Sequence, residues 1–139
     1  MITAGMASRN KFPELTLRMR RIWLFFGWML VLLVIYLSLT PTPIQVPVEQ
    51  GDKFGHLLAY AMLMSWFANL YELPAERVIF AIGFVMLGIC LEFVQRWTGY
   101  RSFEVADMVA DAAGVAAGWV LAPPRIPNYL HGIEKQLRI

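Results

Sequence analysis

The sequence predicts an all-α fold: a four-helix transmembrane bundle with cytoplasmic N and C termini and a short C-terminal amphipathic helix. The chain has 139 residues, of which 58% are hydrophobic and 16% charged, and its mean hydropathy is +0.54. Soluble domains usually carry about 25% charged residues. A single domain of this size cannot bury so many large apolar side chains, so we expect lipid to cover much of its surface.

Four apolar runs approach the roughly 20 residues that a helix needs to cross a bilayer. Residues 22–39 contain neither a charge nor a proline, residues 56–71 form a shorter run, and residues 78–94 contain one acid, Glu92. Residues 105–122 are interrupted near their start by Asp107 and Asp111. Residues that end helices follow each run: Thr40-Pro41-Thr42-Pro43, Glu72-Leu73-Pro74, Thr98-Gly99 and Pro123-Pro124.

The basic residues predict the orientation of this bundle. A cytoplasmic N-terminus satisfies the positive-inside rule, with nine Lys and Arg residues inside and three outside. The inner residues are Arg9, Lys11, Arg18, Arg20, Arg21, Arg77, Arg125, Lys135 and Arg138, and the outer ones are Lys53, Arg96 and Arg101. A cleaved secretory signal is the alternative for the first run, but the run exceeds the usual apolar core of roughly 7–15 residues and no clear A-x-A site follows.

The chain divides into three predicted parts. Residues 1–21 are a flexible, basic cytoplasmic lead, residues 22–122 are the four-helix transmembrane domain, and residues 123–139 are a cytoplasmic tail at the membrane interface. The spacing in the tail is typical of an amphipathic helix lying on a membrane: Tyr129, Leu130, Ile133 and Leu137 oppose His131, Glu134, Lys135 and Arg138. A frayed polar terminus is the alternative.

Composition also excludes some functions. The formal net charge of +2 is too small to indicate nucleic-acid binding, so we expect no nucleic-acid partner. The single cysteine, Cys90, cannot form an internal disulfide, and its apolar surroundings favour an inert buried thiol over a nucleophile. No Cys and His residues have the spacing of a zinc module.

Ionisable and polar residues gather at one end of the predicted bundle. An ionisable residue at the bilayer centre costs roughly 2.5–3.5 kcal/mol, so it needs a partner or a function. The residues near the predicted outer surface are Asp52, Lys53, His56 and Tyr60 on the second helix, Glu92 and Gln95 on the third, Arg101 in the outer loop, and Asp107 and Asp111 on the fourth. His56 and Tyr60, Asp107 and Asp111, and Glu92 and Gln95 are three or four residues apart, so each pair shares a helix face. The inner half of the predicted bundle has almost no polar residues of this kind. We therefore expect one shared site in the outer leaflet.

Several of these residues also have a structural interpretation. Asp52 is a candidate N-cap of the second helix, and Asp107 suits the first turn of the fourth helix because negative charge is favoured there. Arg96 and Arg101 could instead anchor the chain to the outer headgroups. The aromatic belts of a membrane protein are the alternative for Tyr60, Trp66 and Trp97. His56, Glu92 and Asp111 lie a turn or more inside apolar sequence, so they are the strongest candidates for a site.

Small residues follow the acids of the fourth helix at four-residue spacing: Ala106, Ala110, Gly114 and Gly118. Such a stripe lets another helix approach closely. We expect it to dock the fourth helix against the second or third. A homo-oligomer formed through Gly114 and Gly118 is the alternative.

The order and spacing of these motifs resemble the VanZ-like family of small bacterial integral membrane proteins. The matching strings are Asp52-Lys53-x-x-His56-x-x-x-Tyr60, Glu92-x-x-Gln95, Arg101-Ser102-Phe103 and Asp107-x-x-x-Asp111-x-x-Gly114-x-x-x-Gly118. The resemblance covers residues 52–118, and the first helix fits by position only. It implies a multi-pass protein of the bacterial cytoplasmic (inner) membrane with a cell-envelope role. The founding member is associated with resistance to the glycopeptide antibiotic teicoplanin, but the resemblance implies no reaction.

One position departs from the family pattern, which usually has Asn where this chain has Asp111. The additional carboxylate joins Asp52, Glu92 and Asp107 near two fixed cations, Lys53 and Arg101. Such an excess of negative charge requires either a protonated carboxylate or a bound cation.

The first hypothesis is a binding protein whose outer-leaflet pocket takes a membrane lipid or a lipid-linked or glycopeptide-like envelope molecule. Arg101 would hold a phosphate or carboxylate through its planar guanidinium. Flanking aromatic residues would hold an acyl, prenyl or sugar part: Tyr60, Trp97, Tyr100 and Phe103. The expected ligand-binding residues are Asp52, Lys53, His56, Tyr60, Glu92, Gln95, Arg101, Asp107 and Asp111.

The second hypothesis is a membrane hydrolase or transferase acting on an envelope lipid, with His56 or Glu92 as general base. Asp107, Asp111, Glu92 and His56 would then hold a divalent cation. Oxygen ligands suit Mg²⁺ or Ca²⁺, and histidine with carboxylates also suits Zn²⁺ or Mn²⁺. No nucleophile motif stands beside them. The remaining classes are an ion-coupled carrier and a structural scaffold for envelope machinery.

Overall fold

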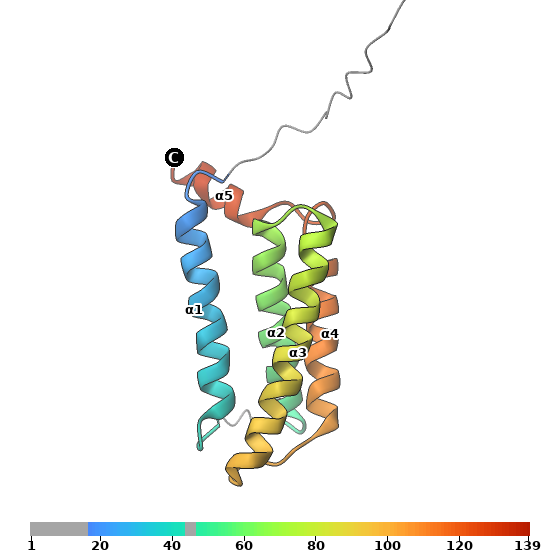
Figure 1. Cartoon of the computed structure of the whole chain (residues 1–139). Helices are drawn as coiled ribbons and strands as arrows, with labels where there is room; N and C mark the ends of the chain where they lie inside the picture. The colour runs from blue at the N-terminus through green and yellow to red at the C-terminus, as the bar shows by residue number, and fades with distance from the viewer. Residues whose placement is uncertain (1–16, 44–46) are drawn as a thin grey trace, which may run out of the picture.

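The computed structural model describes residues 17–43 and 47–139. The described residues form five helices and no strand: α1 (Arg20–Leu39), α2 (Gly51–Leu70), α3 (Pro74–Thr98), α4 (Val105–Val120) and α5 (Tyr129–Gln136). Helices α1 to α4 run up and down alongside one another, and α5 crosses the bundle end at which α1 begins (Figure 1). The predicted all-α fold is therefore confirmed. Most of the predicted cytoplasmic lead, residues 1–21, lies outside the described residues.

Helices α1, α2 and α3 begin before the apolar runs that predicted them, and α4 ends two residues before its predicted end. Helix α2 begins at Gly51, five residues before the predicted start, and its first turns contain Asp52 and Lys53. Helix α3 begins at Pro74, whose fixed φ suits the first helical position, and ends at Thr98, with Gly99 at its C-cap in a left-handed conformation (φ of 77°). Polar residues thus form the end turns of these helices, because their side chains can reach partners or water there.

Helix α2 is the centre of the bundle. Its residues Leu63, Met64 and Phe67 have no exposed surface, and Phe84 of α3 and Val115 of α4 join them in one apolar cluster. Helix α4 packs along α2 more extensively than any other pair of described helices does. Val31 and Val34 of α1 belong to the same cluster, so all four long helices, which run alongside one another in Figure 1, contribute to the core.

The glycine stripe explains the close approach of α4 to α2. A Cβ atom at Gly114 would overlap the backbone carbonyl of Leu57, and a Cβ atom at Gly118 would overlap that of Ala61. The prediction that this stripe docks α4 within the chain is therefore confirmed, with α2 as its partner. A homo-oligomer through Gly114 and Gly118 stays an untested prediction, and α2 already covers both residues.

The outer faces of α1 and α3 are apolar. Only Gly27, Val31 and Val34 of α1 are buried, and large side chains point outward from both helices, among them Phe25, Trp28, Leu32, Ile79, Ile82 and Met86. Cys90 is also exposed, so the predicted burial of this thiol was wrong: it lies on an outward face of α3. Such surfaces suit contact with lipid.

By length and composition, two of the described helices, α1 and α3, could each cross a membrane. Together with the apolar outer faces, this supports a membrane location. Helix α4 has 16 residues and is about 24 Å long at 1.5 Å per residue, which is shorter than a hydrocarbon core of about 30 Å. Four membrane spans and cytoplasmic termini therefore stay predictions.

The tail forms a helix as predicted, but one residue of its predicted polar face, Glu134, is buried. Leu130 has no exposed surface and packs with Leu17 and Leu70. Glu134 is only 3% exposed, because it accepts hydrogen bonds of 2.9 Å from the backbone N–H groups of Arg18 and Met19. The first N–H groups of a helix lack partners inside the helix, so the carboxylate of α5 satisfies groups at the start of α1.

The α5 end of the bundle also contains a buried polar network, which contradicts the expectation that this half is almost free of such residues. Arg77 donates hydrogen bonds to the backbone carbonyls of Tyr71, Ala68 and Pro123. The side chain of Asn69 accepts a hydrogen bond from the backbone N–H of Tyr129. These bonds join the ends of α2 and α3 to the segment that leads into α5.

Candidate functional site

His56 of α2 lies between two acids of α4. Its Nδ1 atom is 2.9 Å from Oδ1 of Asp111, and its Nε2 atom is 3.8 Å from Oδ2 of Asp107. Asp107 and Asp111 are one turn apart, so they share the face of α4 that packs against α2. Both carboxylates are almost fully buried, at 3% and 2% exposure. The glycines further along α4 bring the two helices close enough for this contact.

Lys53 lies one turn before His56 and contacts a residue that the sequence analysis did not select. Its Nζ atom is 2.7 Å from Oε2 of Glu104 and 3.7 Å from Oδ1 of Asp107. Glu104 occupies the N-cap position of α4, and the hydrogen bond from Lys53 lowers the pKa of Glu104 below its ordinary value. The side chain of Glu104 is 41% exposed, so this ion pair contributes little stability.

Glu92 and Gln95 connect the helix ends around this cluster. Glu92 accepts a hydrogen bond of 3.1 Å from the backbone N–H of Glu104, and Gln95 donates one of 2.7 Å to the carbonyl of Ser38. The hydroxyl of Tyr100 donates to the carbonyl of Leu39 at 2.7 Å. These bonds tie the last turns of α1 and α3 and the entry to α4, so Glu92, Gln95 and Tyr100 hold helix ends together.

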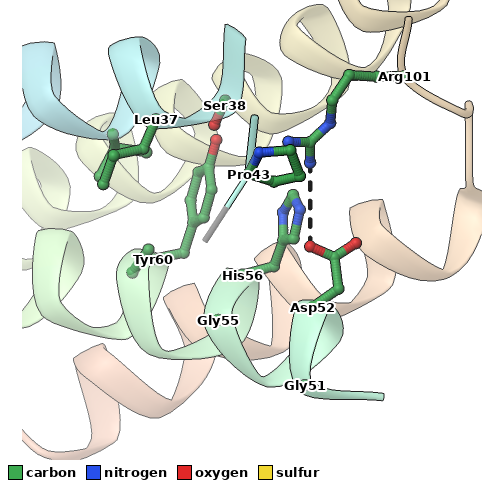
Figure 2. A pocket seen from close by; sticks show the side chains of 11 residues that line it. Leu37, Ser38, Pro43, Gly51, Asp52, Gly55, His56, Tyr60 and Arg101 are labelled. Atoms are coloured by element: carbon green, nitrogen blue, oxygen red, sulfur yellow. Dashed lines mark ion pairs between the residues drawn. The ribbon is translucent and has the colours of Figure 1, made fainter. Parts of the chain in front are cut away.

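A pocket of about 240 Å³ lies between α1 and α2 near the same end of the bundle. In Figure 2, Asp52, His56 and Arg101 lie at one end of the pocket, and Tyr60 and Leu37 lie at the other. Nη2 of Arg101 is 3.9 Å from Oδ1 of Asp52, the pair marked by the dashed line. The complete lining is Val34, Leu37, Ser38, Pro43, Gly51, Asp52, Gly55, His56, Ala59, Tyr60 and Arg101.

Four of the nine predicted ligand-binding residues line this pocket: Asp52, His56, Tyr60 and Arg101. The other five are not part of its lining, and the contacts described above involve each of them: Lys53, Glu92, Gln95, Asp107 and Asp111. Of the aromatic residues expected to flank the pocket, only Tyr60 lines it. Trp97 is 90% exposed, and Phe103 packs against Phe93.

Of the two acids proposed for helix starts, Asp52 does not have the expected role and Asp107 has the expected position. Gln50, with a left-handed backbone, occupies the N-cap of α2, so the alternative of Asp52 as that cap was wrong. Asp107 does lie in the first turn of α4. Arg96 lies over the ring of Phe103, 5.5 Å from its centroid, rather than among the cluster of acids.

A cation could be held by a different set of residues from the one expected. Among the described residues, donor atoms of Asp52, His56 and Asp107 all lie within 4.8 Å of one another. Glu92 and Asp111, which the sequence analysis included, are already bonded to Glu104 and His56. The arrangement thus combines one imidazole nitrogen and one carboxylate of the pocket lining with the carboxylate of Asp107 beside it.

The model of the VanZ/LLP1 family matches residues 5–126, which include all four long helices and the residues of the site. The chain belongs to the VanZ/LLP1 family. A curated relative, an uncharacterized protein of Schizosaccharomyces pombe, is 31% identical over 97 residues, which are 66% of this chain. The chain spans 58% of the length of that relative. No solved structure matches the chain.

Membership of the VanZ/LLP1 family confirms the resemblance on which the sequence analysis relied. It also widens the context, since the curated relative comes from a yeast. A bacterial inner membrane and a role in teicoplanin resistance therefore do not follow from family membership alone.

Proposed function

We propose that this VanZ/LLP1 protein binds the anionic headgroup of a membrane lipid or lipid-linked envelope molecule in the pocket between α1 and α2. Arg101 carries the proposal. Its side chain is only 11% exposed, and its Nη1 atom is buried without a hydrogen-bond partner among the described residues. A guanidinium binds a phosphate or carboxylate through two parallel hydrogen bonds, so an anionic headgroup supplies the partner that Nη1 lacks.

The remaining lining suits the apolar part of such a ligand. Val34 and Leu37 of α1 and Ala59 of α2 line the pocket. Its volume of about 240 Å³ is below the roughly 300–1,000 Å³ of sites that enclose drug-sized ligands. The size favours a headgroup with the start of its chain, and a glycopeptide-like ligand would have to bind by a small part of its structure.

Native mass spectrometry of the full chain in detergent tests this proposal. The probes are dioctanoyl phosphatidic acid, the uncharged dioctanoylglycerol and inorganic phosphate. We expect the phosphatidic acid to bind best, because only this probe provides both an anion for Arg101 and an apolar chain. Preferential binding of inorganic phosphate would instead indicate a site for a free anion.

The variant Arg101→Gln should lower the bound fraction of phosphatidic acid to that of dioctanoylglycerol. Arg96→Gln is the matched control, since Arg96 is exposed and lies over Phe103 outside the pocket. It removes the same charge from the same end of the bundle. Equal loss of binding in both variants would show a general charge effect and contradict a specific role for Arg101.

A lipid hydrolase or transferase is the second candidate, and the pairing of His56 with Asp111 favours it. A general base needs a second group to orient it, and the 2.9 Å contact with Asp111 leaves the Nε2 atom of His56 free to accept a proton. Phosphate release from dioctanoyl phosphatidic acid tests this candidate. His56→Ala should abolish release with little loss of binding in an enzyme, and absence of release from the unaltered protein would exclude this reaction.

A structural scaffold is the third candidate, and the bonds of Glu92 and Gln95 to helix ends favour it. In a scaffold, Glu92→Gln and His56→Ala should mainly lower the thermal unfolding temperature. In a binding protein the same changes should weaken capture of the phosphatidic acid. The two classes are thus separated by measuring unfolding and binding on the same variants.

A further inference from the structure

We propose that Asp52, His56 and Asp107 form a site for one divalent transition-metal ion such as Zn²⁺ or Mn²⁺. One donor atom from each residue lies within 4.8 Å of the others. Asp52 and His56 line the polar end of the pocket, and Asp107 lies beside it. Two residues come from α2 and one from α4, so the close packing of these helices builds the site. This inference does not rest on lipid binding.

The orientation of His56 is the first argument. Its Nδ1 atom is held by Asp111 at 2.9 Å, which leaves Nε2 to face Asp107. Metal-binding histidines almost always use their other nitrogen in this way, with a carboxylate or carbonyl as partner. Asp111 is therefore a positioning residue in this arrangement, not a ligand.

The spacing of the donors is the second argument. The 3.8 Å between Nε2 of His56 and Oδ2 of Asp107 is too long for a hydrogen bond. Zinc binds nitrogen and oxygen at about 2.0–2.2 Å, so two ligands of one ion lie about 3–4 Å apart. The pair already has the separation that a shared ion requires.

Asp107 supplies an independent observation. Asp107 is only 3% exposed. Its Oδ1 atom has no hydrogen-bond partner among the described residues. The closest cation, Nζ of Lys53, is 3.7 Å away and is hydrogen-bonded to Glu104. A buried carboxylate with an oxygen that lacks a hydrogen bond is costly, and a cation bound by both oxygens of Asp107 would offset that cost.

The local charge favours the same conclusion. Five acids surround the site, against two fixed cations: Asp52, Glu92, Glu104, Asp107 and Asp111 face Lys53 and Arg101. A divalent ion offsets this excess of negative charge. The donor set selects its type, because Mg²⁺ and Ca²⁺ prefer oxygen ligands throughout, whereas an imidazole with carboxylates suits Zn²⁺ and Mn²⁺.

Titration calorimetry of the untagged full chain in detergent, with Zn²⁺ or Mn²⁺ alone, tests the site. We expect one ion per chain. Asp52→Asn should weaken binding by at least about 10-fold, since loss of even an outer partner of a metal site costs about 10–100-fold. Glu49→Gln is the matched control, because Glu49 is exposed, lies three residues before Asp52 and is not a member of the site. The metal affinity of this variant should equal that of the unaltered protein.

The side chain of Asp52 is 54% exposed, so the Asp52→Asn variant should fold. Its thermal unfolding temperature checks that it does. His56→Gln should abolish binding where it folds. Absence of stoichiometric binding, or equal affinity in the Asp52→Asn and Glu49→Gln variants, would overturn the site. Because no lipid is present, either result leaves the headgroup proposal intact.

Discussion

Asp111 is buried against His56, and this contact predicts the effect of replacing Asp111 with Asn. An amide oxygen can still accept a hydrogen bond from Nδ1, so Asp111→Asn should fold. A bond to a charged group contributes about 1.5–3 kcal/mol and a neutral one about 0.5–1.5 kcal/mol, so unfolding should become easier by about 1 kcal/mol. Thermal unfolding in detergent measures this change.

The same variant should bind Zn²⁺ or Mn²⁺ about 10-fold more weakly, because a neutral amide makes the imidazole a poorer donor than a carboxylate does. Asp111→Ala is the comparison, since it removes the hydrogen bond altogether and should weaken binding further. Equal metal affinity in the unaltered and Asn proteins would show that Asp111 has no part in the site.

At the level of single residues, helical spacing predicted some contacts and not others. His56, Asp107 and Asp111 lie at fixed intervals on two helices, so their shared faces could be read from the sequence. Glu104 lies in a connecting segment without periodicity, and its contact with Lys53 depends on how the chain enters α4. No pattern near Glu104 indicated that contact.

Among the elements, the contact of α4 with α2 depends on the absence of side chains at two positions. Gly114→Ala or Gly118→Ala would push a methyl group into the backbone of α2, and overpacking of this kind costs about 1–3 kcal/mol. Gly83→Ala is the control, because nothing lies near a Cβ atom there. Alanine favours a helix over glycine by up to about 1 kcal/mol, so Gly83→Ala should be neutral or stabilising.

Thermal unfolding of the three variants measures the difference. Because α4 holds Asp107 and Asp111, the two destabilising changes should also weaken metal binding. Equal unfolding temperatures for Gly114→Ala and Gly83→Ala would mean that α2 and α4 can separate without cost, which the geometry contradicts.

Helix α5 is attached to α1 through Glu134, and this attachment should depend on pH. Burial alone would raise the pKa of Glu134, but hydrogen bonds from Met19, Trp23 and Arg18 outweigh it and lower the pKa below its ordinary value. A lowered pKa contributes stability above the ordinary value of about 4.3, and this contribution is lost as the pH falls through the folded-state pKa. Docking of α5 should therefore be constant from pH 7 to 5 and weaken below about 4.

Hydrogen exchange of the α5 amides, corrected for the intrinsic effect of pH, measures this docking. Glu134→Gln should lower protection at pH 7 by about 1–3 kcal/mol and remove most of its pH dependence, because the amide cannot be charged. Lys135→Gln is the control, since Lys135 is exposed on the same helix. Unchanged protection in Glu134→Gln would contradict the capping role.

The elements show where prediction from sequence succeeds and fails. Apolar length predicted four helices, because a membrane-sized run is a property of consecutive residues. The start of α2 and both ends of α3 were placed too far inward, since charged turns at Gly51 to Lys53 and at Arg96 continue these helices. The buried face of α5 was missed because the partner of Glu134, the start of α1, lies more than a hundred residues away.

For the whole molecule, the arrangement of the helices sorts the basic residues between two ends. At the end with α5 and the start of α1, the structure describes seven: Arg18, Arg20, Arg21, Arg77, Arg125, Lys135 and Arg138. The end with the pocket has three: Lys53, Arg96 and Arg101. In a membrane, the positive-inside rule then favours a cytoplasmic α5 end and an outward pocket.

Cysteine labelling tests this orientation, because Cys90 is the only cysteine of the chain. In a Cys90→Ala background, Glu49→Cys marks the pocket end and Lys135→Cys marks the α5 end, both at exposed positions. In intact bacterial cells, a membrane-impermeant maleimide should label Glu49→Cys directly and Lys135→Cys only after permeabilisation. The reverse pattern would place the pocket on the cytoplasmic side, where an envelope molecule of the outer leaflet could not reach Arg101. Equal labelling of both positions in intact cells would contradict a chain that spans the membrane with its two ends on opposite sides.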